Sequence, residues 1–354
     1  MRFPAIVVLC IVLLWMTVLA SDLPPFTKAW SYATGGSVFS SPTLGEGILK
    51  GSAGGKALVY IGSFDNNVYA FDTVTGAVAW KFATTSQIWA SPTVAYGYVY
   101  IGSDSFYCLN ASTGAMKWKL SAGSGFFASA AVVGGKVYVG GWDDNVYCLN
   151  AMTGAVIWTF TGGAAMSSSP LYLDGIVYVG SDDNNIYALN AADGKMVWTF
   201  DAGDQVVSNP RVNDGIMYIG SGGDMFYAIN ITTGTAVWSK TTNELVVATA
   251  AYYKGVVYIG SWGGHMYALN ASNGKAVWTS QTFGGKIRSA AFVDPATNAL
   301  YFGCEDNNVY ALSLATGAVL QSYTTGGPVR SSPVVAEGIL YVGSYDNSVY
   351  AMKV

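Results

Sequence analysis

The side chains that carry most enzyme chemistry are scarce in this sequence. Its 354 residues include one histidine, His265, and four cysteines scattered along the chain. Common zinc sites need clustered histidine and cysteine ligands, and a Ser-His-Asp triad needs a histidine oriented by a carboxylate. His265 stands in the tight turn 263–266 with no such partner, so we expect a solvated turn residue. This inventory predicts no metal site and no catalytic residue.

A second group of residues could bind a ligand without transforming it. Eight short segments end in Ser-Pro or a close variant, as in Phe39-Ser-Ser-Pro42 and Arg330-Ser-Ser-Pro333. The residue three places before the Pro, or before its Ala equivalent, varies although its surroundings repeat. These residues are Phe39, Trp89, Phe127, Ser167, Val207, Val247, Arg288 and Arg330.

Arginine recognises carboxylate or phosphate through forked hydrogen bonds, and aromatic rings supply flat apolar contact. If the eight segments converge on one channel, three aromatic side chains would face two arginines at its mouth. The functional interpretation is a site for an anionic or aromatic ligand, or for a partner's side chain. The alternative is ordinary packing with solvated arginines.

The elements that would position these residues repeat about every 40 residues. Val59-Tyr-Ile-Gly-Ser and Val177-Tyr-Val-Gly-Ser each precede an Asp/Asn turn, a second apolar run, a Gly and a Trp. Runs of four to six residues rich in Val, Ile, Tyr and Trp, separated by Gly, Asn and Asp, are typical of strands and hairpins. Hairpin chemistry explains the Asp/Asn turns, which lack the spacing of a calcium loop.

The two chain ends predict how the repeats close into a ring. The last unit stops at Ala351-Met352, before its Trp strand, whereas Lys28-Ala-Trp30 has a Trp and no unit before it. Joining the two would complete an eighth unit and hide both open sheet edges. We therefore predict an all-β fold: an eight-bladed β-propeller of four-stranded antiparallel blades, closed by the N-terminal strand in the C-terminal blade.

The repeat also carries a family resemblance. Ala188-Leu-Asn-x-x-x-Gly194-x-x-x-Trp198 resembles the tryptophan-docking repeat of the pyrroloquinoline-quinone-like propellers, and the likeness covers residues 26–354. It implies that the recurring indoles pack between neighbouring blades. They are Trp30, Trp80, Trp118, Trp158, Trp198, Trp238 and Trp278. Gln321 takes this place in the seventh unit, which predicts a looser junction there.

This resemblance spans enzymes and non-catalytic scaffolds. The enzymes are quinoprotein dehydrogenases, which hold the quinone with calcium, a catalytic Asp and often a vicinal disulfide. Here the predicted innermost strands carry no carboxylate in their cores and no Cys-Cys dipeptide exists. The scaffolds include the lipoprotein that assists assembly of outer-membrane barrels, although this sequence lacks a lipid-attachment cysteine at its processing site.

Other residues have structural interpretations as well as functional ones. Four aromatic residues follow the Gly-Ser or Gly of their units and should lie near the mouth, as an interaction surface or stacked between blades: Phe64, Trp142, Trp262 and Tyr345. Three sequons begin at Asn110, Asn230 and Asn270, in surface turns that could carry glycans. Three cysteines replace small repeat residues, so we expect buried thiols and no disulfide: Cys108, Cys148 and Cys304.

Residues 1–20 are typical of a secretory signal peptide cleaved after Ala20, with an uncleaved anchor as the alternative, and the propeller would span 21–354. A formal net charge of −4 gives no basic surface for nucleic acid. We expect a secreted or periplasmic, monomeric propeller without catalysis or cofactor, acting as a binding scaffold for a protein partner. The alternatives are a minimal quinoprotein oxidoreductase using pyrroloquinoline quinone and calcium, and a glycan-binding propeller.

Overall fold

The computed structural model describes residues 23–45, 57–242 and 244–354. The predicted signal peptide lies outside these residues and stays a prediction. Within the described ranges, no helix is long and apolar enough to cross a membrane. Strands and turns make up the described structure.

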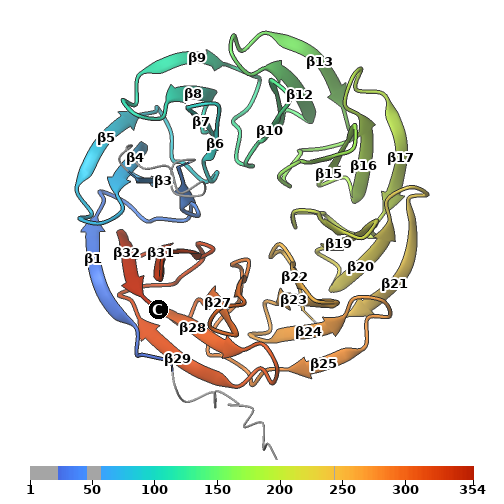
Figure 1. Ribbon diagram of the computed structural model, residues 1–354. Helices are drawn as coiled ribbons and strands as arrows, with labels where there is room; N and C mark the ends of the chain where they lie inside the picture. The colour runs from blue at the N-terminus through green and yellow to red at the C-terminus, as the bar shows by residue number, and fades with distance from the viewer. Residues whose placement is uncertain (1–22, 46–56, 243) are drawn as a thin grey trace, which may run out of the picture.

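Thirty-two strands form eight four-stranded antiparallel sheets arranged in a ring, which confirms the predicted eight-bladed propeller (Figure 1). Blades 1 to 4 comprise β2 (Thr43–Leu44), β3 (Leu58–Gly62), β4 (Asn67–Asp72), β5 (Val78–Ala83); β6 (Thr93–Ala95), β7 (Tyr98–Gly102), β8 (Phe106–Asn110), β9 (Met116–Leu120); β10 (Ala131–Val133), β11 (Lys136–Gly140), β12 (Asn145–Asn150), β13 (Val156–Thr161); β14 (Leu171–Leu173), β15 (Ile176–Gly180), β16 (Asn185–Asn190) and β17 (Met196–Asp201). Blades 5 to 7 comprise β18 (Arg211–Asn213), β19 (Ile216–Gly220), β20 (Met225–Asn230), β21 (Thr235–Thr241); β22 (Ala251–Tyr253), β23 (Val256–Gly260), β24 (Met266–Asn270), β25 (Ala276–Thr279); β26 (Phe292–Asp294), β27 (Ala299–Gly303), β28 (Asn308–Ser313) and β29 (Val319–Thr324).

The eighth blade joins the two ends of the chain, as predicted. Its inner strands are β30 (Val334–Ala336), β31 (Ile339–Gly343) and β32 (Ser348–Lys353), and its outer strand is β1 (Thr27–Ala33). β1 pairs antiparallel with β32, and Trp30 lies opposite Ala351. The ring is therefore closed by backbone hydrogen bonds between segments more than 300 residues apart.

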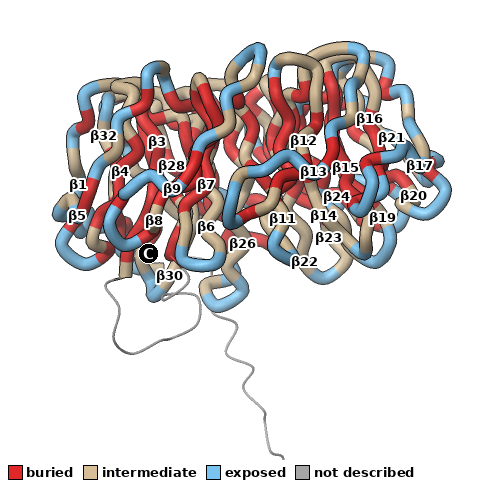
Figure 2. The backbone as a smooth tube through the Cα atoms, turned by 90° about the horizontal axis from the view of Figure 1, so that it is seen from above, coloured by how far each residue is buried: buried red, intermediate tan, exposed pale blue. Residues whose placement is uncertain are grey.

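The second strand of each blade is buried on both faces. In β15, Val177 to Gly180 is buried throughout, because neighbouring blades cover both sides of the sheet (Figure 2). The terminal glycine of this strand receives the next blade's innermost segment. A Cβ on Gly180 would lie 2.6 Å from the Val206 carbonyl oxygen, so only glycine allows this approach.

The seven repeated tryptophans dock each blade onto the next. Each indole N–H donates to a backbone carbonyl of the following blade over 2.8 to 3.2 Å. The ring faces the turn glycine of that blade: Trp118, for example, covers Gly154, whose φ of +73° favours glycine. Tyr100 donates to the same Ala151 carbonyl that Trp118 uses, over 3.2 Å. At six of the seven junctions a tyrosine shares the indole's carbonyl in this way, so two hydrogen bonds accompany one packed indole; the exception among the described residues is Trp198.

At the seventh junction Gln321 replaces the docking tryptophan, and its side chain bonds to the segment that precedes β1. Its Oε1 accepts from Phe26 N over 2.8 Å and its Nε2 donates to Pro24 O over 2.7 Å. The outer strand of the eighth blade is β1, so no turn glycine follows β32 for an indole to cover. The side-chain amide instead ties the segment before β1 to blade 7, while Phe26 packs against Tyr301.

The Asp/Asn turns are hairpin turns held by a carboxylate. Asp65 Oδ2 accepts from the Tyr69 hydroxyl over 2.6 Å and from Gly35 N over 2.8 Å, and Asn66 has a φ of 68°. Burial alone would raise the pKa of Asp65, but these hydrogen bonds and those from Asn67 outweigh it and lower the pKa. This aspartate therefore fastens the turn to the segment that leads into the innermost strand.

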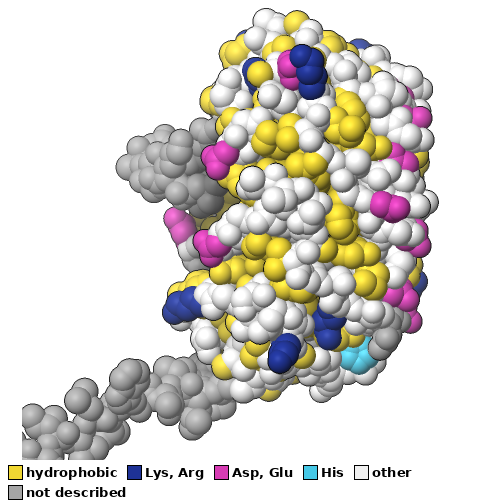
Figure 3. Space-filling model, turned by 90° about the vertical axis from the view of Figure 1, so that its right-hand side faces the viewer, with side chains coloured by type: hydrophobic (Ala, Val, Ile, Leu, Met, Phe, Trp, Pro, Cys, Tyr) yellow, Lys and Arg dark blue, Asp and Glu magenta, His cyan; other side chains and the backbone are white. Residues whose placement is uncertain are grey.

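The outer strands expose apolar side chains just before the docking tryptophan. Met196 and Val197 on β17 are about half exposed, as are Val156 and Ile157 on β13. Figure 3 shows apolar side chains exposed on this side of the rim between scattered charged groups.

Candidate binding site at the channel mouth

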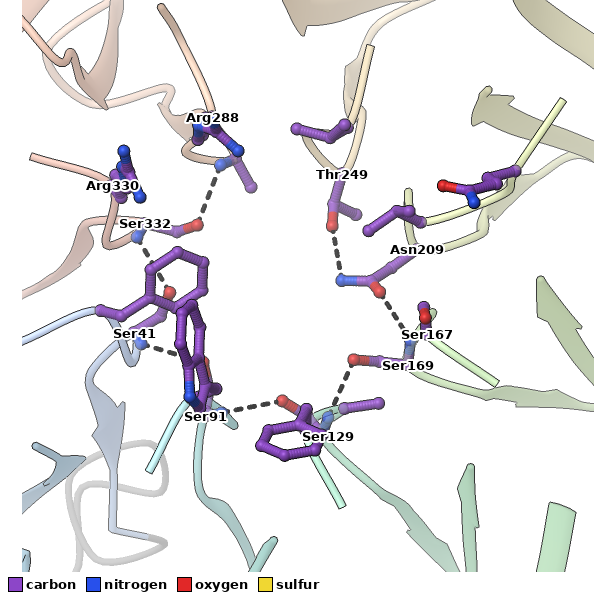
Figure 4. A pocket seen from close by; sticks show the side chains of 18 of the residues that line it. Ser41, Ser91, Ser129, Ser167, Ser169, Asn209, Thr249, Arg288, Arg330 and Ser332 are labelled. Atoms are coloured by element: carbon purple, nitrogen blue, oxygen red, sulfur yellow. Dashed lines mark hydrogen bonds between the residues drawn. The ribbon is translucent and has the colours of Figure 1, made fainter. Parts of the chain in front are cut away.

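The eight variable residues converge on one cavity of about 480 Å³ at the centre of the ring (Figure 4). All of them line it: Phe39, Trp89, Phe127, Ser167, Val207, Val247, Arg288 and Arg330. Each blade contributes one such residue from the segment before its innermost strand. Their role in binding stays a prediction.

A ring of hydrogen bonds joins the blades two residues further along these segments. In its first part, Ser41 N donates to Ser91 Oγ over 2.9 Å, Ser91 N to Ser129 Oγ over 3.2 Å, and Ser129 N to Ser169 Oγ over 3.0 Å. The chain of bonds continues from Ser169 N to Asn209 Oδ1 and from Asn209 Nδ2 to Thr249 Oγ1. On the other side, Ala290 N donates to Ser332 Oγ and Ser332 N to Ser41 Oγ, each over 2.9 Å.

This ring is open at one place. Ala290 has no side-chain acceptor for the Thr249 backbone N–H, which has no hydrogen-bond partner in the described part of the chain. The serine Oγ atoms of the ring each accept a backbone N–H, whereas Thr249 Oγ1 accepts from the Asn209 side-chain amide. The hydroxyls of Ser91, Ser129 and Ser169 have no acceptor among the described residues. The cavity is therefore surrounded by hydroxyl groups that can still donate. The recurring Ser-Pro pattern is the sequence signal for this ring.

One side of the mouth is a continuous aromatic surface, which we call the aromatic arc. It runs through six rings whose neighbouring centroids are 4.3 to 6.5 Å apart: Tyr345, Phe64, Phe39, Trp89, Phe127 and Trp142. Of the aromatic residues after Gly-Ser or Gly, one stacks between blades and one is exposed, and a role as an interaction surface stays a prediction. Phe64 packs against Trp89 of the next blade at 4.5 Å, while Trp142 is 50% exposed.

The other side is cationic and is built around Glu305. Glu305 Oε1 lies 2.6 Å from the Nε atoms of both Arg288 and Arg330. Arg288 Cζ also lies 3.8 Å from the centroid of the Trp262 ring, and Lys286 Nζ lies 4.0 Å from it. We call Lys286, Arg288 and Arg330 the cationic arc. The arginines are thus held by an ion pair and by stacking, and about a quarter of each side chain stays exposed.

The two arcs meet at Tyr345. Arg330 Nη1 donates to the Tyr345 hydroxyl over 2.9 Å, and its Cζ lies 4.6 Å from the centroid of that ring. Burial raises the pKa of Tyr345, although the positive charge of Arg330 opposes the shift. The hydroxyl therefore stays protonated at neutral pH and the contact is a neutral acceptor beside a guanidinium.

Three polar atoms of cavity-lining residues are buried without a hydrogen-bond partner in the described structure. One is Arg330 Nε, which contacts Glu305 as an ion pair only. The other two are Trp262 Nε1, a donor, and Asp182 Oδ1, an acceptor. Both residues line the cavity, and Gly222 of blade 5 lies between their blades without a side chain to separate them. Burial raises the pKa of Asp182. An occupant that offers both an acceptor and a donor would satisfy these atoms.

Sequence reasoning missed both carboxylates. Glu305 and Asp182 occupy the register of Phe64 and Trp262, directly after the Gly-Ser or Gly-Cys that ends the second strand. The sequence argument weighs carboxylates only in the cores of the predicted innermost strands, and neither residue lies there. The same register that pointed to the aromatic residues would have found them.

The carboxylates at this mouth do not fit a calcium site. Calcium takes six to eight oxygen ligands, including several carboxylates. Asp182 belongs to blade 4 and Glu305 to blade 7, and Glu305 is already paired with two arginines. No cluster of three or more His, Cys, Asp or Glu side chains suited to a metal occurs among the described residues.

The remaining candidate residues do not line the cavity. His265 Nε2 is 3.0 Å from Thr282 Oγ1, at a turn. Asn110, Asn230 and Asn270 use Oδ1 to accept backbone N–H groups of their own turns, and glycosylation stays a prediction. The three described cysteines, at 108, 148 and 304, are buried and free.

A family model matches this chain in four overlapping segments that together cover its repeats. The family described as outer membrane protein assembly factor BamB matches the chain over 27–125, 102–211, 142–298 and 289–354. The chain belongs to this family. The resemblance to the pyrroloquinoline-quinone-like propellers is thereby confirmed. No curated protein is similar enough in sequence to count as a match.

Solved structures share the fold of this BamB-family chain. BamB from Moraxella catarrhalis is 22% identical, with a TM-score of 0.76, over 94% of this chain and 98% of that one. The quinohemoprotein alcohol dehydrogenase from Comamonas testosteroni is 16% identical, with a TM-score of 0.74, over 95% of this chain and 78% of that one. The designed protein Ika8 is 15% identical, with a TM-score of 0.78, over 92% and 99%. At these identities the likeness concerns the fold alone.

Proposed function

We propose that this chain is a non-catalytic, protein-binding propeller of the secretory pathway or periplasm, and that its partner docks at the channel mouth. The observation that carries the proposal is the aromatic arc beside the cationic arc around one cavity. Aromatic residues and arginine are enriched at protein interfaces, where they supply most of the binding energy. The description of the family as an outer membrane protein assembly factor agrees with a protein partner.

The same observations favour a scaffold over a quinoprotein enzyme. Calcium with pyrroloquinoline quinone needs a set of carboxylate ligands, whereas the carboxylates here stand on blades 4 and 7 and one is neutralised by arginines. The hydroxyls of Ser91 and Ser129 accept backbone N–H groups of the neighbouring blades, so they have a structural role that holds the ring together. We therefore propose that the protein works without a cofactor.

A peptide-display selection tests the proposal. Random peptides of about a dozen residues are panned against the purified protein, and selected peptides are measured by fluorescence anisotropy. We expect Trp89→Ala, in the aromatic arc, to weaken binding, and Met196→Ala, on the exposed outer rim, to leave it unchanged. Thermal melting of both variants establishes that they are folded.

Two outcomes would overturn the proposal. One is the failure of the selection to yield any peptide whose binding depends on the mouth. The other is a saturable, calcium-dependent rise in melting temperature with pyrroloquinoline quinone, since a ligand selective for the folded state stabilises it. That rise would restore the enzyme interpretation.

Binding to a glycan array tests the remaining alternative. Array binding that Trp89→Ala abolishes would assign the mouth to sugars instead of a protein partner.

A further inference from the structure

The cationic arc has more positive charge than its own contacts neutralise. Arg288 and Arg330 line the cavity, Lys286 lies against the ring of the cavity-lining Trp262, and Glu305 is the carboxylate paired with the two arginines. The whole chain carries a formal net charge of −4, so the positive charge at this site is opposite in sign to the net charge of the protein. A charge arrangement of this kind favours an anionic occupant.

The arginines keep hydrogen-bonding capacity for that occupant. Glu305 contacts both of them through Nε, and the Nη atoms of Arg288 have no hydrogen-bond partner in the described structure. Trp262 Nε1 is a further donor without a partner at the same side of the cavity. Leaving a buried donor unpaired is unfavourable, and a carboxylate oxygen would satisfy it.

The neighbouring surface fixes what must accompany the anion. Tyr345 contacts Arg330 and also Phe64, at a centroid separation of 5.9 Å, so the anion site and the aromatic arc adjoin. On the opposite side Asp182 Oδ1 offers an acceptor for a donor of the occupant, such as a peptide N–H. A carboxylate, an aromatic group and a backbone donor occur together in a polypeptide segment.

We propose that the mouth binds a partner segment in which a carboxylate stands beside an aromatic or large apolar side chain, with the carboxylate on Arg288 and Arg330 and the ring on the aromatic arc. This inference rests on the proposed function and specifies its partner. It assigns Glu305 as a positioning residue that holds both guanidinium groups in place and competes with the incoming carboxylate.

The selected peptides provide the test. We expect them to be enriched in an acidic residue next to an aromatic one, and replacing that acid by its amide to weaken binding about tenfold or more, as for the loss of a charge-assisted hydrogen bond. Arg330→Ala should weaken the acidic peptide by a similar factor and its amide analogue little. Arg211→Ala removes the same charge outside the cavity and should weaken neither.

Glu305→Gln provides an independent measurement with the opposite sign. It removes the competing carboxylate, so the acidic peptide should bind several-fold more tightly while the amide analogue is unaffected. Mouth-dependent peptides without an acid preference, or an acidic peptide indifferent to both Arg330→Ala and Glu305→Gln, would overturn this inference and leave the proposed function standing. Absence of any mouth-dependent peptide would instead refute the proposed function.

Discussion

Substituting one turn glycine separates the cost of backbone strain from the cost of displacing a docking indole. Gly154 has a φ of +73°, and a Cβ there would lie 2.7 Å from two ring carbons of Trp118. Gly97 has a φ of +77°, but a Cβ there would meet nothing within 4 Å. Gly97→Ala is therefore a matched control for Gly154→Ala.

The expected magnitudes follow from these contacts. A left-handed backbone costs a residue with a Cβ about 1 to 2 kcal/mol, and both variants share this cost. Gly154→Ala must also push the indole aside, which costs about 1 to 3 kcal/mol as overpacking. Losing the Trp118 hydrogen bond adds about 0.5 to 1.5 kcal/mol, and not more, because the Ala151 carbonyl keeps its bond from Tyr100. Gly154→Ala should thus lose about 1.5 to 4.5 kcal/mol more stability than Gly97→Ala.

Denaturant unfolding followed by fluorescence and circular dichroism measures this difference, provided the m-values agree. In a Trp118→Ala background the indole is absent, and Gly154→Ala should then cost no more than Gly97→Ala. Equal losses for the two glycine variants in the wild-type background, or an unchanged cost after Trp118→Ala, would refute indole docking as a source of stability.

Three further predictions concern the ring closure, the channel and the carboxylate turns. Gln321→Ala removes the bonds to Pro24 and Phe26, so the segment before β1 should become sensitive to limited proteolysis; an unchanged cleavage pattern would contradict the role given to Gln321. Ala290→Ser supplies the acceptor missing opposite Thr249 and should raise the stability by about 0.5 to 1.5 kcal/mol, measured as a higher denaturation midpoint; a lower midpoint would contradict the open ring. At Asp183, burial raises the pKa, but bonds from Tyr187, Asn185 and Gly163 outweigh it and lower the pKa, so its stabilisation is present above the unfolded pKa and is lost as pH falls through the folded value. Asp183→Asn should therefore lower stability at pH 7 and reduce the loss of stability below about pH 4, where an ordinary aspartate begins to be protonated, and an unchanged pH profile would contradict this.

The sequence by itself determined the architecture. A 40-residue period with short β-branched runs leaves few folds open, and the orphan Trp30 strand together with the unfinished last unit fixes how the ring closes. The repeat also fixes register, so the sequence alone predicts that the eight variable residues share one channel, and all eight line one cavity. These features are local or periodic, so they can be derived from the order of residues.

The tertiary structure alone decided the chemistry of the mouth. Glu305 meets Arg288 and Arg330 because one turn of blade 7 approaches segments of blades 7 and 8. A repeat period of 40 residues does not reveal which side chains form ion pairs. Gln321 likewise reads as a lost tryptophan until the strand beside β32 is seen to come from the other end of the chain. Contacts between blades depend on side-chain direction and on the ring geometry, and only the folded ring brings them together.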